Sequence, residues 1–218
     1  MTCKVLVLNN YDYGQPFNAL GFEVSYITNP NVDQLLDAHL VCFTGGTDVD
    51  TRLYGEAKNS YAGDPDVRRD TREAKIFETC VEAHIPMVGI CRGFQFLNVM
   101  NGGKLVQHCN GHAGPNHTVI DLDDGIFGGH EFVVNSLHHQ MVILPENKRL
   151  GIPILVTPSV VSSYYIGEGG VELSIPQEVE AAVFPRTRSA GVQYHPEMMA
   201  QTSAAAKFFQ GIVRGLLK

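Results

Sequence analysis

The stretch that decides the fold reads Val88-Gly89-Ile90-Cys91-Arg92-Gly93-Phe94-Gln95. It ends an apolar run that predicts a buried strand, and a helical pattern begins directly after Cys91. Strand, sharp turn and helix, with a reactive side chain at the turn, is the layout of a nucleophile elbow. The two flanking glycines let the chain turn without a Cβ clash. The pattern predicts Cys91 as a nucleophile; the alternative is a buried cysteine that packs like a small apolar side chain.

A second segment, Gly191-Val192-Gln193-Tyr194-His195-Pro196-Glu197, supplies the partners that such a nucleophile needs. A cysteine nucleophile requires a base, and the base requires an orienting carboxylate. We predict that His195 takes the thiol proton and that Glu197 holds its imidazole in the useful tautomer. Taken singly, these residues have another interpretation, as a surface histidine and a solvated carboxylate.

The first half of the chain alternates predicted strands and helices. We expect strands at residues 4–8, 23–27, 39–43 and 86–90 and a short helix at 32–38. This alternation predicts an α/β fold of three layers, in which helices flank a mostly parallel open sheet. Ligands bind at the carboxyl ends of such strands, where Gly45-Gly46 and Cys91 both lie.

Two longer helices and a set of later strands complete the prediction. A helix capped near Asp66 is expected to bury the face formed by Ala74, Phe77, Val81 and His84. The last helix has an apolar stripe of Ala205, Phe208, Phe209, Ile212, Val213 and Leu216. Strands at 118–122, 132–134, 154–156 and 179–184 predict a small antiparallel extension. With no repeat or linker in the pattern, residues 1–218 are predicted to form a single domain.

Composition narrows the class of protein. At 218 residues and 44% hydrophobic content, the chain is long enough for a well-packed globular domain. A net charge of −7 argues against nucleic acid and anionic lipid as partners. Five cysteines show no disulfide framework, which predicts a reduced, cytoplasmic setting. We expect neither a signal peptide nor a membrane span.

Five sequence blocks together make the chain resemble class I glutamine amidotransferase domains, within them the γ-glutamyl-γ-aminobutyrate hydrolase-like (peptidase C26-like) branch. The blocks lie at residues 43–56, Arg69-Asp70, 88–103, 134–140 and 191–197. Two details favour the hydrolase branch: Arg92 stands where the biosynthetic domains usually have leucine, and residues 135–140 read Asn-Ser-Leu-His-His-Gln. Departures from the branch are Thr51 in place of proline, Tyr194 in place of Phe or Trp, and the lack of Asp-Gly before Glu180.

The resemblance implies a flavodoxin-like fold and a cysteine hydrolase that cleaves γ-glutamyl amide bonds through a thioester on Cys91. The oxyanion hole would combine the backbone N–H of Arg92, which an elbow supplies, with that of Gly46. Gln95, one helical turn after Cys91, would hold the glutamyl group, and Ser136 and His138 are further substrate-binding candidates. Each also has an alternative interpretation. Gln95 could be a glutamine on the helix surface, and Ser136 and His138 could belong to a polar loop that hydrogen-bonds its own backbone.

Other functions stay open at this point. A glutaminase subunit that delivers ammonia to a separate synthetase partner would use the same three catalytic residues, whereas a silent binding module would need none of them. The substrate would be a small γ-glutamyl amide or glutamine, and a homodimer is left open. His108, Cys109, His112 and His117 form a loose cluster without a clean second ligand pair, so we predict no metal and no cofactor.

Overall fold

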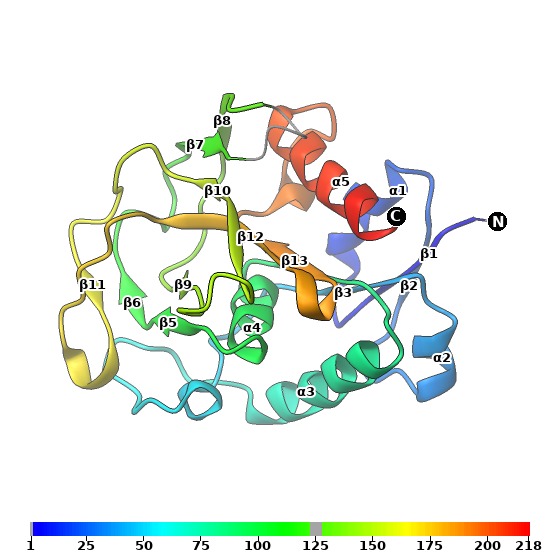
Figure 1. Ribbon diagram of the computed structural model, residues 1–218, viewed down its shortest axis with the longest axis horizontal. Helices are drawn as coiled ribbons and strands as arrows, with labels where there is room; N and C mark the ends of the chain where they lie inside the picture. Colours follow the sequence, from blue (N-terminus) through cyan, green and yellow to red (C-terminus); the bar gives the residue numbers. More distant parts are fainter. Residues whose placement is uncertain (1, 123–127) are drawn as a thin grey trace.

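The computed structural model describes residues 2–122 and 128–218, and within them one sheet of nine strands dominates (Figure 1). Its parallel half contains β2 (Glu23–Tyr26), β1 (Lys4–Val7), β3 (Leu40–Phe43), β4 (Met87–Ile90) and β13 (Ser189–Val192), in this order. Its antiparallel half continues with β12 (Val179–Phe184), β10 (Ile152–Val156), β7 (His117–Asp121) and β8 (Glu131–Val134). The predicted α/β fold with an antiparallel extension is therefore confirmed.

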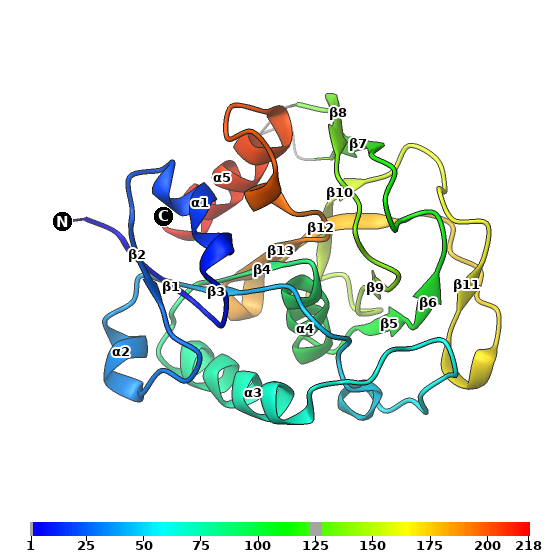
Figure 2. The same ribbon diagram turned by 180° about the vertical axis from the view of Figure 1, so that it is seen from behind.

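Helices cover both faces of this sheet, as Figures 1 and 2 show from opposite sides. On one face lie α1 (Gln15–Asn18) and α5 (Ala204–Leu216), and on the other lie α2 (Val32–Leu36), α3 (Val67–Glu82) and α4 (Arg92–Met100). Each face has its own apolar core. The rings of Phe17 and Phe209 meet at 5.7 Å on the first face, and those of Phe43 and Phe96 stack at 5.6 Å on the second.

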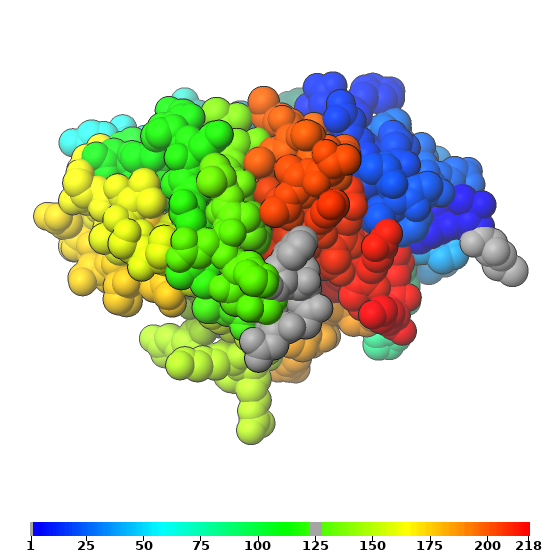
Figure 3. Space-filling model, turned by 90° about the horizontal axis from the view of Figure 1, so that it is seen from above, coloured from blue at the N-terminus to red at the C-terminus, as the bar shows by residue number. Residues whose placement is uncertain are grey.

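Shorter elements lie around the antiparallel half. Two small pairs are β5 (Lys104–Val106) with β9 (Met141–Ile143) and β6 (His108–Cys109) with β11 (Tyr165–Ile166). Short 3₁₀ turns occur at η1 (Tyr11–Gly14), η2 (Thr51–Tyr54), η3 (Glu168–Gly170), η4 (Pro185–Thr187) and η5 (Pro196–Met198). Seen from above, the N-terminal segments (blue) and the antiparallel half (green to yellow) lie at opposite ends, with the C-terminal segment (orange to red) between them (Figure 3).

The buried face of α3 differs from the predicted one. Ile76, Phe77 and Cys80 are buried, whereas Ala74 and Val81 are only half-buried and His84 is exposed beyond the end of the helix. The same buried face carries three charged residues, Arg69, Asp70 and Glu73. A search for apolar periodicity counts such residues as exposed, because charges are buried only when they are paired. The predicted cap is confirmed, since the Asp66 side chain accepts a hydrogen bond from Arg69 N at 3.0 Å.

Two other predictions concern the setting of the chain. All five cysteines are free thiols. Among the described residues, no helix combines the length and the apolar character that a transmembrane span requires. The single domain and the cytoplasmic location stay predictions.

Candidate active site

Cys91 occupies a strained turn between β4 and α4, with φ 53° and ψ −112°. A positive φ is uncommon for a residue with a Cβ, and such strain persists only where the surrounding structure imposes it. Here the Cys91 N–H donates to the carbonyl of Val192 on β13 at 2.8 Å, and the Cys91 carbonyl accepts from Gln95 N at 3.1 Å. The elbow predicted from the sequence is therefore present, with the cysteine at its apex.

The flanking glycines are required by close packing around this turn. A Cβ on Gly89 would lie 2.5 Å from the backbone of Gly93, and one on Gly93 would overlap the carbonyl of Phe43 on β3. Both contacts involve backbone atoms, which cannot move aside as the end of a side chain can. Helix α4 thus begins directly against β3 and β4 because neither glycine has a side chain.

His195 and Glu197 lie beside Cys91, after the end of the neighbouring strand β13. His195 Nδ1 is 2.7 Å from Glu197 Oε1, and both residues are buried. Burial by itself lowers the pKa of His195, but hydrogen bonds to Cys91 and Glu197 outweigh burial and raise this pKa to about 10. The structure brings together the thiol, imidazole and carboxylate that the sequence analysis grouped, and the imidazole holds a proton at neutral pH.

Asn135 and Tyr13 also position His195, and the sequence analysis gave neither a role. Asn135 Oδ1 accepts from His195 N at 2.8 Å, and Asn135 Nδ2 donates to His195 O at 2.9 Å. The ring of Tyr13 lies 6.0 Å from that of His195. The position of Asn135 in the block 134–140 was a usable signal, whereas nothing in the sequence around Tyr13 pointed to the site.

The Gly45-Gly46 turn at the end of β3 is held by Arg69. Arg69 donates to the carbonyl of Gly45 at 2.8 Å and to that of Thr44 at 2.7 Å. Gly46 has φ +146°, and a Cβ there would overlap the guanidinium of Arg69. A Cβ on Gly45 would lie 3.3 Å from His195 Cε1, so this turn lies against the imidazole. These contacts place the turn beside His195; the oxyanion role of the Gly46 N–H stays a prediction.

The side chain of Arg92 belongs to a buried ionic network behind the elbow. Its guanidinium pairs with both Asp70 and Glu73 on α3, and its carbon Cζ lies 4.9 Å from the centre of the Phe96 ring. Glu73 also pairs with Arg69 at 2.7 Å, so the same carboxylate links the elbow to the Gly45-Gly46 turn. The network joins the two segments whose N–H groups, those of Arg92 and Gly46, were predicted to form the oxyanion hole.

The three predicted substrate-binding side chains are buried. Gln95 donates to the carbonyl of Gln140 at 3.0 Å and to Gln193 Oε1 at 3.2 Å. Ser136 donates to the carbonyl of His112 at 2.8 Å, and His138 Nδ1 lies 2.9 Å from the carbonyl of Gln140. Burial lowers the pKa of His138 to about 4, so its ring is neutral at pH 7. Substrate binding by Gln95, Ser136 and His138 stays a prediction.

The loose cluster in the sequence around residue 110 separates in the fold. Cys109 packs in a small apolar core with Val106, Met141 and Tyr165, and the ring of His108 stacks on those of Tyr61 and Tyr164. His112 and His117 instead lie next to each other, with ring centres 4.9 Å apart. Only these two of the four join a common cluster, and they do so with His138 and Glu180, which are distant in sequence.

An open pocket of about 570 Å³ borders His195 and Glu197. Asp12, Tyr13 and Met198 also line it. A larger pocket of about 870 Å³ lies between α5 and the strand end near Arg188, and none of its lining residues belongs to the candidate site. Of these two pockets, the smaller one is next to His195 and Glu197.

The chain matches a known protein family over most of its length. The family model described as Peptidase C26 matches residues 28–197. The chain belongs to the peptidase C26 family. It is thus one of the class I glutamine amidotransferase-like proteins, as its sequence blocks predicted.

Relatives of this C26 chain carry amidotransferase names. It is 30% identical to the glutamine amidotransferase-like protein YvdE of Lactococcus lactis, over 74% of this chain and 67% of YvdE. It spans 53% to 67% of the length of the first four curated relatives. A glutamine amidotransferase of Thermotoga maritima has the same fold, with a TM-score of 0.64 and 17% identity over 99% of this chain and 84% of that one. The glutaminase domain of Trypanosoma brucei CTPS, solved with bound acivicin, gives a TM-score of 0.64 and 14% identity over 99% and 94% of the two chains.

Proposed function

We propose that this protein is a cysteine hydrolase of γ-glutamyl amide bonds and that Cys91, His195 and Glu197 are its catalytic triad. The observation that carries the proposal is a strained cysteine at a strand end, beside a histidine whose Nδ1 lies 2.7 Å from a carboxylate oxygen. This is the arrangement that acyl transfer requires of nucleophile, base and orienting group. The free thiols support the cytoplasmic location proposed with it.

In the first half of the reaction, the Cys91 sulfur attacks the δ-carbonyl carbon of the γ-glutamyl group. The negative charge that develops on the carbonyl oxygen is stabilised by the N–H groups of Gly46 and Arg92. The C–N bond then breaks, and the His195 imidazolium gives its proton to the departing amine. The product of this half is a γ-glutamyl thioester on Cys91 and a free amine.

In the second half, water attacks the thioester carbonyl. His195, now neutral, takes a proton from that water, and the sulfur leaves as thiolate while glutamate is released. The imidazolium of His195 and the free sulfur of Cys91 are thereby restored. Glu197 orients and stabilises the protonated imidazole through its contact with Nδ1, and Gln95, Ser136 and His138 are proposed to surround the glutamyl group or the leaving amine.

Replacing Glu197 by glutamine is expected to move the alkaline limit of activity to lower pH. The Glu197 carboxylate is one of the groups that raise the pKa of His195 to about 10. Without this charge the pKa of His195 falls, so the imidazolium needed to protonate the amine is lost at lower pH. The pH dependence of kcat for Glu197→Gln measures the shift, with the exposed Glu82→Gln as its control. An unchanged alkaline limit would show that Glu197 does not set the protonation of His195.

The substrate class is tested by measuring amine or ammonia release from a panel of γ-glutamyl amides that includes glutamine. A hydrolase of this branch is expected to cleave substituted γ-glutamyl amines at least about tenfold better than glutamine, a difference of about 1.4 kcal/mol in transition-state binding. Cleavage of glutamine alone would contradict the proposed substrate class. No cleavage of any member of the panel would contradict the reaction itself.

A glutaminase subunit is the second candidate function. It is favoured by the likeness in fold to the glutaminase domain of Trypanosoma brucei CTPS and by a short match to the carbamoyl phosphate synthase small chain of Ralstonia nicotianae, 37% identical over 67 residues. In that case the subunit hydrolyses glutamine slowly by itself, and the rate rises when a synthetase binds. Rates with glutamine that stay low until a partner protein is added would favour this function over the first.

A further inference from the structure

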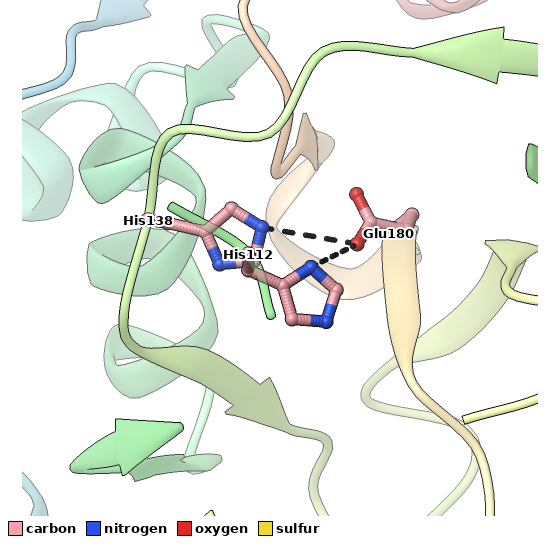
Figure 4. A group of neighbouring side chains, drawn as sticks. All are labelled: His112, His138 and Glu180. Atoms are coloured by element: carbon pink, nitrogen blue, oxygen red, sulfur yellow. Dashed lines mark ion pairs between the residues drawn. The ribbon is translucent and has the colours of Figure 1, made fainter. Parts of the chain in front are cut away.

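A second cluster of buried ionisable side chains lies outside the catalytic group (Figure 4). It consists of His112, His138 and Glu180, whose ligand atoms all lie within 4.8 Å of one another. His112 Nδ1 and His138 Nε2 are each 3.9 Å from the same oxygen, Glu180 Oε1, and point toward it (Figure 4). The three residues come from separate parts of the chain, so the fold itself assembles the cluster.

In His112 and His138, one ring nitrogen faces Glu180 (the inner nitrogen) and the other points away from it (the outer nitrogen). Each outer nitrogen has a hydrogen-bond acceptor. His112 Nε2 lies 3.1 Å from Glu178 Oε1, and His138 Nδ1 lies 2.9 Å from the carbonyl of Gln140. Each outer nitrogen is assigned the proton because its partner can only accept. The inner nitrogens, His112 Nδ1 and His138 Nε2, then carry lone pairs. A histidine whose outer N–H binds a carboxylate or carbonyl is the usual form of a metal ligand.

Among the described residues, none makes a hydrogen bond of good geometry to the carboxylate at the centre of the cluster. Glu180 is fully buried, and neither of its carboxylate oxygens has a hydrogen-bond partner among the described residues. The Ser136 hydroxyl is next to both inner nitrogens, but it donates to the carbonyl of His112 at 2.8 Å. His117 Nε2 lies 3.3 Å from Glu180 Oε1 and also lacks a hydrogen bond. Burying a carboxylate and lone pairs together is unfavourable unless a cation lies among them.

We propose that His112, His138 and Glu180, with His117 as a fourth ligand, bind one Zn²⁺ ion. Three imidazole nitrogens and one carboxylate oxygen form a ligand set that Zn²⁺ accepts in four-coordinate sites. Mg²⁺ and Ca²⁺ prefer six or more oxygen ligands, which this cluster does not offer. Glu178, which also accepts from Ser162 N and Tyr165 OH, fixes the ring of His112 as an outer partner of the ion.

The site lies behind the catalytic histidine. His138 follows Asn135 by three residues, and Asn135 holds both backbone polar groups of His195. Glu180 lies on β12, where its carbonyl accepts from Gln193 N at 2.8 Å, two residues before His195. A bound ion would therefore tie together the two segments that position His195, as a structural site. His138 would then serve the ion instead of the substrate, which leaves Gln95 and Ser136 as the substrate-binding candidates.

The proposal is tested on the full chain after treatment with a chelator that removes bound metal. Zn²⁺ binding is then measured by competition with a chromophoric chelator, and its effect on stability by thermal unfolding. We expect one Zn²⁺ per chain and a Tm that rises by roughly 5 to 10 °C at about 100 times the Kd. Glu180→Gln and, separately, His117→Gln should weaken Zn²⁺ binding by about 100-fold or more. When Co²⁺ replaces Zn²⁺, the unchanged protein should show the visible absorption of a four-coordinate site. The Glu180→Gln and His117→Gln variants should not show it.

The controls separate this site from other ligands. The exposed His84→Gln should bind Zn²⁺ like the unchanged protein, and Cys91→Ala should retain the same ion because the active-site thiol is not a ligand. If Glu180→Gln does not fold, the partly exposed His117→Gln still decides the result. Zn²⁺ that neither binds nor raises the Tm would overturn the proposal. Equal loss of binding in His84→Gln would also contradict it.

Discussion

Replacing Cys91 by alanine is expected to reduce γ-glutamyl amide hydrolysis by at least about 10⁴-fold, because no other group can form the thioester. The fold should survive. Alanine fits the space of the buried cysteine, and both residues meet the same backbone strain at φ 53°. The Tm should therefore stay within a few degrees of the unchanged protein. Steady-state hydrolysis and circular dichroism of the same preparation measure the two effects.

A matched control for this substitution is Cys3→Ala, since Cys3 is a partly exposed thiol without a role at the site. That variant should keep full activity. A Cys91→Ala protein that retains more than about a tenth of the original rate would contradict a cysteine nucleophile. A protein that loses both activity and fold would point instead to a structural role for Cys91, and Cys91→Ser would then separate the two effects.

Replacing Arg92 by leucine, the residue usual in the biosynthetic domains, is expected to destabilise the protein by about 3–5 kcal/mol. Arg92 is 1% exposed, and its guanidinium pairs with Asp70 and Glu73, which are also buried. Leucine would leave two carboxylates with less positive charge beside them, Arg69 remaining paired with Glu73. Urea unfolding of Arg92→Leu measures the loss.

The cause of that loss can be tested with two further variants. Arg68→Leu, which removes an exposed arginine from the same helix α3, should change the free energy of unfolding by less than about 0.5 kcal/mol. Adding Asp70→Asn to Arg92→Leu should recover part of the stability, because an uncharged amide no longer requires the cation while Glu73 keeps its pair with Arg69. A further loss in that double variant would show that shape, not charge, determines the role of Arg92.

Local patterns were enough to predict the elbow and most of the regular elements. Cys91 with glycines at both sides defines strand, turn and helix within eight residues, and the apolar stripe of α5 predicts its buried side. The segment 195–197 also contains both partners of the nucleophile. In these cases the physical cause, a backbone turn or an apolar face, lies within one short stretch of sequence.

Contacts between distant segments could not be predicted in the same way. The buried face of α3 includes Glu73, whose burial depends on Arg92 and Arg69 and is invisible to apolar periodicity. Likewise, spacing in the sequence grouped His112 with Cys109, whereas the sheet places it with His138 and Glu180. The family resemblance identified His138 as a residue of interest, but only the fold shows which groups surround it.

The central claim is that Cys91 carries a γ-glutamyl thioester during turnover. The most direct measurement is mass spectrometry of the protein quenched in acid during hydrolysis of a γ-glutamyl amide, followed by digestion. We expect the peptide that contains Cys91 to gain the mass of one γ-glutamyl group, and no such gain in Cys91→Ala. Hydrolysis at full rate with no adduct on Cys91, or with the adduct on another residue, would contradict the account.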